Sequence, residues 1–380
     1  MIKFQVQHYT LKSYKHFDSI KESWVDFNNN PSLCPENLIA IENSEINDVT
    51  PYYVMVYVQG QLKGLIYYQM LHFNSSFIDL GILNKWYYNL LQFFIRRIKT
   101  NLLICGSLFR IDFKGFDGVS GDEVAMITKT IAEESLLGKR ISGILMKDLE
   151  IDLGLKTQNL FKFKPMHSDV TMVMPIRNSW NNMDDYLNDL KRKYKKRVNK
   201  ILSDGKPLEI RELELAEIKQ YESEISNLYN QIVRKQIVRL GVLNGLYFME
   251  MKRQLKDKYK IYGFFHDGQL VAFSTHIHYG NSMEIYYIGF SYPQNNTFQL
   301  YFNILYHGLS IAIEKKYKSI ELGRTAKEAK ASMGAEPEAS INYVCINNPF
   351  LNGLFNKIRK NFSRKMGETW ANRQPLKYFF

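Results

Sequence analysis

The chain has 380 residues, of which 45% are hydrophobic, and it carries a formal net charge of +12. This length predicts two domains, and the apolar residues spread along it exclude a largely disordered chain. No stretch is long and apolar enough to span a membrane, and the first ten residues lack the core of an export signal, so we expect a cytoplasmic protein. Three dispersed cysteines predict structural thiols and no metal site. The positive charge favours anionic partners.

The first half begins with a predicted β-hairpin over Tyr52–Phe73, with Gln59 and Gly60 at its turn. Alternating and periodic apolar residues then predict further elements. These are a strand at 77–80, a helix at 85–98, a strand at 102–105, a helix at 122–137 and strands at 142–146 and 170–174. This order is typical of a mixed α/β domain with helices packed on a sheet.

A basic helix is predicted over residues 180–204, after a domain boundary that we place at residue 176. Seven of the ten residues from Lys191 to Lys200 are Lys or Arg, and they surround the helix instead of forming one stripe. One interpretation is a solvated face, because three aspartates precede the run. The density of charge favours the other interpretation, contact with tRNA phosphates, an anionic acceptor or a peripheral membrane surface.

The second half repeats the order of the first. A hairpin over Tyr259–Gly280 has Asp267 and Gly268 at its turn, and both hairpins carry Gly-Gln-Leu there. The elements expected next are a strand at 283–292, a turn at 293–297, a helix at about 298–316, a strand at 319–322, a short helix at 326–333, a strand at 341–346 and a helix from about 350. We therefore expect two domains, residues 1–176 and 177–380.

Two segments resemble a known group of proteins. Residues 185–197 are similar to the opening of the second domain in Fem-type peptidoglycan aminoacyltransferases. Residues 321–337, Glu-Leu-Gly-Arg-Thr-Ala-Lys-Glu-Ala-Lys and then Gly-Ala-Glu-Pro, are similar to the strand–Gly-Arg-Thr–helix element of their tandem-GNAT relatives. The resemblance implies an α/β fold of two tandem GNAT-like domains, with mixed central sheets flanked by helices. It also implies a structural N-terminal copy and an active C-terminal copy.

One departure from the GNAT pattern concerns the donor. Acetyl-CoA-using GNAT enzymes carry a glycine-rich loop after the third strand, whereas residues 294–300 contain no glycine. Fem-type enzymes take aminoacyl-tRNA and also lack this loop. The resemblance therefore leaves acyl-CoA, acyl carrier protein and aminoacyl-tRNA open as donors, with an amine, such as that of a peptidoglycan precursor, as acceptor. No metal is expected.

Two segments are candidates for holding the anionic part of the donor. Asn295, Asn296 and Thr297 precede the expected helix, where free N–H groups favour a phosphate or where the side chains form a routine cap. The Gly323–Thr325 turn, with Gly323, Arg324 and Thr325, follows a strand, so that Gly323 permits close approach and Arg324 offers a planar fork. An ion pair of Arg324 with a capping turn is the alternative. Lys327 and Lys330 could add positive charge.

The candidate catalytic residues lie on the neighbouring strands. Tyr286 or Tyr287 could protonate the leaving group, and Gly289 after them could let a cofactor approach, although buried aromatics are common in a core. Because residues alternate along a strand, we expect only one of the two tyrosines to line a cleft. Glu321 is the first candidate for the base, with Glu284 and the His276–His278 pair as alternatives.

These features favour an N-acyltransferase in which donor and acceptor meet in the C-terminal domain. A backbone amide of residues 286–290 would polarise the carbonyl. The N-terminal counterpart of the Gly-Arg-Thr turn is expected at Gly106–Arg110, which lacks the Gly-Arg pair. The alternatives are a non-enzymatic module that binds an anionic ligand and an RNA-binding protein that uses the basic helix.

Overall fold

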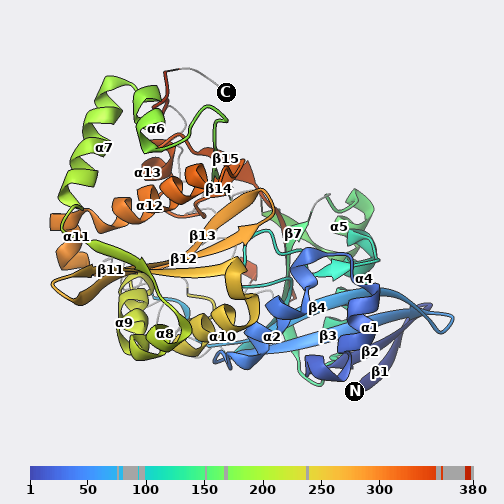
Figure 1. The fold of residues 1–380 in the computed structure, drawn as a ribbon. Coiled ribbons are helices and arrows are strands. Elements are labelled where there is room, and N and C mark those ends of the chain that lie inside the picture. Colours follow the sequence, from blue (N-terminus) through green and yellow to red (C-terminus); the bar gives the residue numbers. More distant parts are fainter. Residues whose placement is uncertain are drawn as a thin grey trace. The chain divides into compact units, whose positions relative to one another are not determined.

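The computed structural model describes residues 1–74, 77–79, 93, 99–149, 152–166, 170–236, 239–347, 352–353 and 373–377. The chain forms two compact units (Figure 1). The first contains the described residues of 1–169, 236–243 and 340–366, and the second those of 170–235, 244–339 and 367–380. The helices expected at 85–98 and from 350 fall almost wholly outside the described residues. Among described residues, no helix is long and apolar enough to cross a membrane.

The first unit is built on a mixed sheet with strand order β1-β2-β3-β4-β5-β7-β16-β8, in which β6 pairs with β4. Its strands are β1 (Ile2–Val6), β2 (Tyr9–Tyr14), β3 (Val49–Val58), β4 (Gln61–Phe73), β5 (Thr100–Cys105), β6 (Phe116–Asp117), β7 (Ile141–Leu149), β8 (Lys164–Met166) and β16 (Ile341–Ile346). Its α-helices include α1 (Lys21–Phe27), α2 (Pro35–Asn43), α4 (Gly121–Glu133) and α5 (Leu155–Phe161). Helix α4 starts with a Ser120–Glu123 capping box and packs an apolar face into the core.

The second unit has a sheet of order β10-β11-β12-β13-β14-β9-β15. Its strands are β9 (Val170–Pro175), β10 (Glu209–Glu212), β11 (Tyr259–His266), β12 (Gln269–Tyr279), β13 (Ser282–Phe290), β14 (Ser319–Glu321) and β15 (Glu336–Ala339). Its α-helices include α6 (Met183–Asp189), α7 (Arg192–Asp204), α8 (Leu215–Gln220), α9 (Glu222–Val233), α10 (Gly245–Leu255), α11 (Tyr292–Phe298), α12 (Leu300–Glu314) and α13 (Lys327–Ala331). Figure 1 shows α7 and α12 on one side of this sheet and α8, α9 and α10 on the other.

Both predicted hairpins are confirmed, as β3–β4 and β11–β12. Both residues of each turn have positive φ: 50° and 82° at Gln59–Gly60, and 50° and 75° at Asp267–Gly268. Such two-residue turns match the twist of the flanking strands. Each hairpin also has a register shift at the same place, after Val56 and after Phe264, two strand residues before the turn. The two hairpins of the internal repeat therefore share the position of this register shift as well as the order of their strands.

Each sheet contains one strand from the other half of the chain. Strand β9 lies between β14 and β15 and runs antiparallel to both. Strand β16 lies between β7 and β8, again antiparallel to both. The last strand of each repeat thus occupies the same position in the sheet of the other repeat. The compact units consequently depart from the boundary expected at residue 176.

The strand pairing also changes which strands of the two halves correspond. Strand β5 pairs antiparallel with β4 and then parallel with β7 across α4. Strand β13 pairs antiparallel with β12 and then parallel with β14 across α12. The counterpart of β14 is therefore β7 and not β5, and the expected equivalence of Gly106–Arg110 with the Gly-Arg-Thr turn is wrong. The hydrophobic patterns of β5 and β7 are too similar to show which of these short buried strands corresponds to β14.

The strand exchange predicts how fragments of the chain behave. Residues 177–380 expressed alone lack β9, so β14 and β15 lose the backbone partner between them. We expect this fragment to be insoluble or largely unfolded, and a fragment of residues 164–380 to be more soluble, as measured by soluble yield and circular dichroism. Equal, native-like behaviour of both fragments would contradict the structural importance of β9.

Candidate functional site

The candidate site lies where β13 and β14 separate. Residues Ser282–Glu284 of β13 pair in parallel with residues Ser319–Glu321 of β14. Strand β13 then continues to Phe290, whereas β14 ends at Glu321. Glu284 and Glu321 are the last register partners, so they point to the same face of the sheet. Glu284 is buried and accepts a hydrogen bond of 2.9 Å from the Tyr279 hydroxyl. The carboxyl end of β14 is thus lined with acidic side chains.

Lys330 is the residue that sequence reasoning undervalued. It was expected only to add positive charge beside Lys327, but just 3% of it is exposed. Burial lowers its pKa from 10.5 to about 7, with a smaller opposing effect of the Glu321 carboxylate and a further lowering by Lys327. A lysine with this pKa is charged and neutral in similar amounts near pH 7, so it can act as a base, and such perturbed groups cluster at functional sites. The Ala-Lys-Ala-Ser-Met run around it was the available signal, because a lysine among small and apolar residues of a helix faces the core.

Gly323 is required by the backbone conformation of the turn and not by the space around it. Its φ of +80° is in the left-handed region that favours glycine, and a Cβ built on it would lie 3.8 Å from Lys330 Nζ. Its carbonyl accepts a hydrogen bond of 3.1 Å from Met172 N–H in β9, which fixes the turn. Arg324 is partly buried, and Thr325 is exposed. Ala326 is the N-cap of α13, so Thr325 does not cap this helix.

Tyr286 and Tyr287 lie on the same side of β13, contrary to the expected alternation. Their ring centroids are 4.4 Å apart, and both rings contact Tyr247. The reason is a register shift between β12 and β13 opposite them, which interrupts the period of two. The hydroxyl groups of Tyr286 and Tyr247 share a hydrogen bond.

Burial raises the pKa of Tyr287 well above its usual value, with further increases from Tyr229 and Tyr247. Such a phenol is a poorer acid than free tyrosine, so Tyr287 suits a neutral hydrogen-bond donor better than a general acid. Its backbone N–H donates to Thr275 Oγ1 at 2.8 Å, and its carbonyl accepts from the same hydroxyl. That amide is therefore already engaged within the sheet.

Gly289 is buried beneath α9. A Cβ at this position would lie 2.3 Å from Phe273 Cε1 and 2.7 Å from the carbonyl carbon of Leu228. The glycine thus allows the helix backbone to approach the strand closely, which accounts for it without a cofactor.

The helix expected at about 298–316 is confirmed as α12, and a separate short helix precedes it. Asn295, Asn296 and Thr297 lie inside α11, which starts at Tyr292 with Pro293 in its first turn. Gln299, with φ of 49°, separates α11 from α12. Asn295 Oδ1 accepts a hydrogen bond of 2.9 Å from Tyr301 N–H, so it caps α12 from the preceding helix. The turn expected at 293–297 is therefore wrong, because Pro293 opens a helix there, whereas Asn295 has the capping role that was one of its two interpretations.

The His276–His278 pair, an alternative candidate for the base, lies largely away from solvent. His276 is fully buried next to Tyr262 and His307, and its Nε2 lies 3.1 Å from Ser274 Oγ. Burial lowers the pKa of His276 well below its usual value and that of His278 to about 4. Both rings are neutral near pH 7. Among the described residues, no group of three His, Cys, Asp or Glu side chains is placed to hold a metal ion.

Several solved structures are similar to this chain, and FemX is similar enough to show the fold. The crystal structure of FemX covers 92% of this chain and 100% of its own length, with a TM-score of 0.51 and 12% identity. A tandem GNAT protein from the clavulanic acid biosynthesis pathway covers 89% of this chain and 99% of its own, with a TM-score of 0.47 and 12% identity. A probable N-acyltransferase from Enterococcus faecalis V583 covers 88% of this chain and 72% of its own, with a TM-score of 0.48 and 10% identity. The fold is a tandem GNAT fold of the Fem type.

The particular family follows from the sequence model that matches this chain. Residues 164–377, more than half of the chain, match the FemAB_like family, described as peptidoglycan biosynthesis/recognition. The chain belongs to this family. The matched range begins before β9, in keeping with the place of that strand in the second sheet. No curated protein matches the chain in sequence.

The depressed pKa of Lys330 has a consequence for stability. The unfolded lysine holds its proton up to about pH 10.5, whereas the folded one loses it above about pH 7, so the stability of the wild type rises with pH between these values. We predict that Lys330→Met raises Tm by several degrees at pH 7 and that this gain shrinks toward pH 10. Each unit of pKa difference corresponds to about 1.4 kcal/mol. The control is Lys327→Met on the same helix, and a Lys330→Met variant with lower Tm at pH 7 would refute the burial argument.

The substitution Gly289→Ala distinguishes a packing role of this glycine from a contact with a cofactor. The added methyl group forces α9 away from β13, and overpacking of this kind costs about 1–3 kcal/mol. We expect a lower Tm without any ligand present, by differential scanning fluorimetry. An unchanged Tm would show that the close packing does not require glycine.

Proposed function

We propose that this protein is an N-acyltransferase that moves an acyl or aminoacyl group from an activated donor to an amine by direct transfer. The observation that carries the proposal is a buried Lys330 with a pKa of about 7, held near Glu321 at the end of β14. Burial of a charged amine is costly, and a lysine whose pKa lies near 7 can take up and release a proton at neutral pH. Membership of the FemAB_like family supports the same conclusion.

In the proposed reaction, neutral Lys330 accepts a proton from the acceptor amine as it attacks the donor carbonyl. A bond forms between the amine nitrogen and the carbonyl carbon, and the bond from that carbon to sulfur or oxygen breaks. The proton passes from the Lys330 ammonium to the leaving thiolate or alkoxide, so Lys330 returns to its neutral form. Glu321 stabilises the transient ammonium. Tyr286 or Tyr287 donates a hydrogen bond to the developing oxyanion, together with an amide of β13 other than that of Tyr287.

The donor is proposed to be acyl-CoA or aminoacyl-tRNA, with its anionic part near Arg324. The acceptor is proposed to be the amine of a peptidoglycan precursor, following the description of the family. The irregular junction of α11 and α12, which lacks glycine, favours aminoacyl-tRNA over acetyl-CoA. We place the reaction in the cytoplasm, where both donors are made, with the first unit in a structural role.

The pH dependence of transfer tests this mechanism. With charged tRNA, acetyl-CoA and a long-chain acyl-CoA as donors and a peptidoglycan-type peptide amine as acceptor, amide formation is followed by mass spectrometry. We predict that kcat/KM rises with pH around an inflection near 7, because the neutral lysine is the base. Glu321→Gln removes the carboxylate that raises the pKa of Lys330, so the inflection moves to lower pH. Lys330→Met abolishes transfer, and Lys327→Met serves as the control.

Absence of transfer with every donor, or activity retained in Lys330→Met, would contradict the proposed mechanism. A thermal-shift titration with the same donors separates binding from chemistry. Arg324→Ala should weaken the donor-induced shift, and an unchanged shift would remove Arg324 from the donor site.

A further inference from the structure

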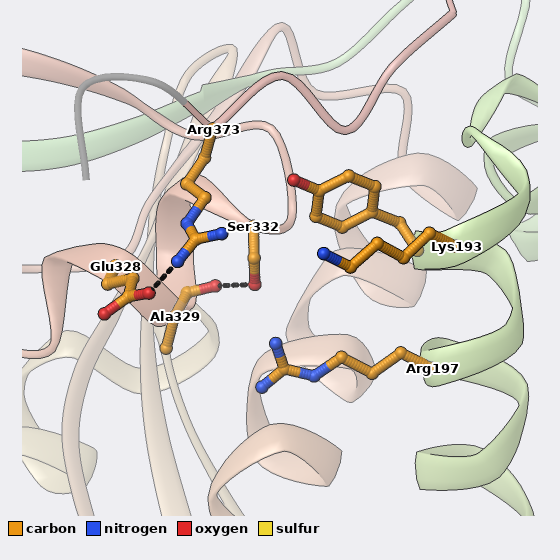
Figure 2. A pocket seen from close by; sticks show the side chains of 7 residues that line it. Lys193, Arg197, Glu328, Ala329, Ser332 and Arg373 are labelled. Atoms are coloured by element: carbon orange, nitrogen blue, oxygen red, sulfur yellow. Dashed lines mark hydrogen bonds and ion pairs between the residues drawn. The ribbon is translucent and has the colours of Figure 1, made fainter. Parts of the chain in front are cut away.

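A second candidate site is a basic pocket between α7, α13 and the segment 373–377 of the second unit. Its volume is about 360 Å³, which suits a small ligand. It is lined by Lys193, Tyr194, Arg197, Glu328, Ala329, Ser332 and Arg373. Figure 2 shows Lys193 and Arg197 extending from α7 toward the residues of α13.

The charges of this pocket are unbalanced. Arg373 is paired with the Glu328 carboxylate. Within the described chain, neither Lys193 nor Arg197 forms an ion pair, although Lys200 on the same helix pairs with Asp204. The three cations and one carboxylate leave two positive charges. A phosphate monoester carries nearly two negative charges at pH 7, whereas a carboxylate carries one.

One of the cations, Arg197, is also held in place before any ligand binds. The Arg197 guanidinium lies 4.8 Å from the centroid of the Phe302 ring, and such stacking keeps a planar fork oriented. The chain on either side of the pocket is tied together, because Lys191 N–H donates to Pro375 O at 2.8 Å and Lys377 N–H donates to Asp189 O at 2.8 Å. Preorganised donors of this kind favour binding by reducing its entropic cost.

Helix α13 connects the pocket to the candidate catalytic site. Glu328 and Ser332 lie on one face of the helix, four residues apart, and Lys330 between them lies roughly opposite. A ligand bound in the pocket is therefore separated from Lys330 by about one helix diameter, ~10 Å.

We propose that this pocket binds a phosphate monoester group, with Lys193 and Arg197 as its ligands. In the context of the proposed function, it anchors the phosphorylated end of a substrate, and that role rests on the proposed function. The binding of a phosphate monoester in this pocket does not depend on the proposed function. The phosphate belongs either to a nucleotide or to a lipid headgroup.

The test measures binding to the whole chain in two arms. Calorimetry with 5′-AMP, and adenosine as the phosphate-free control, tests the nucleotide source. Co-sedimentation with phosphatidylcholine vesicles containing phosphatidic acid tests the lipid source. The variant is Lys193→Ala/Arg197→Ala. Its matched control is Arg192→Ala/Lys196→Ala, which removes the same charge from exposed positions of α7 that do not line the pocket.

We expect one of the two phosphate probes to bind and the pocket variant to weaken that binding by at least about tenfold. The matched control should weaken it by less than about threefold, and binding should strengthen from pH 5 to pH 7 as the phosphate loses its second proton. Equal losses in both double variants, binding of RNA alone, or no binding of either probe would overturn the site. Lys330→Met should leave phosphate binding intact, so failure of transfer and failure of this site are distinguishable.

Discussion

The candidate catalytic site depends on the insertion of β9 between β14 and β15. Backbone hydrogen bonds from Leu322 N–H to Met172 O and from Met172 N–H to Gly323 O continue the pairing past the end of β14. They hold Gly323 in its left-handed conformation and set the start of α13, the helix that carries Lys330. The strand comes from the end of the first repeat, so the chemistry of the second repeat requires a segment outside it.

Burial of an amine is costly, and the rest of the site explains how it is tolerated. The Glu321 carboxylate at the end of β14 opposes the fall in the pKa of Lys330, which leaves a group that is charged and neutral in similar amounts near pH 7. The basic pocket lies across α13 from this group. One short helix therefore separates a candidate proton-transfer site from a candidate phosphate site, and both depend on the chain around Gly334, where Tyr186 donates to Met333 O.

Much of the fold could be predicted from the sequence because its signals are local. The two hairpins follow from paired turn residues, and the tandem order follows from the hydrophobic pattern. The strand exchange could not be predicted, because β9 and β16 have the same alternation whichever sheet they join. The boundary between α11 and α12 was missed for a different reason, since only the backbone of Gln299 marks it.

The functional roles of the site residues stay predictions, and the sequence did not single out Lys330 among them. Glu321, Gly323 and Arg324 were singled out because they end or follow a strand, whereas Lys330 was named only as an added positive charge and its burial was not foreseen. The most direct measurement of the central claim is a titration of Lys330 by NMR, with ¹³C-labelled lysine and Lys330→Met to assign the signal. The account predicts a midpoint near pH 7. A midpoint near the usual value of about 10.4 would contradict it.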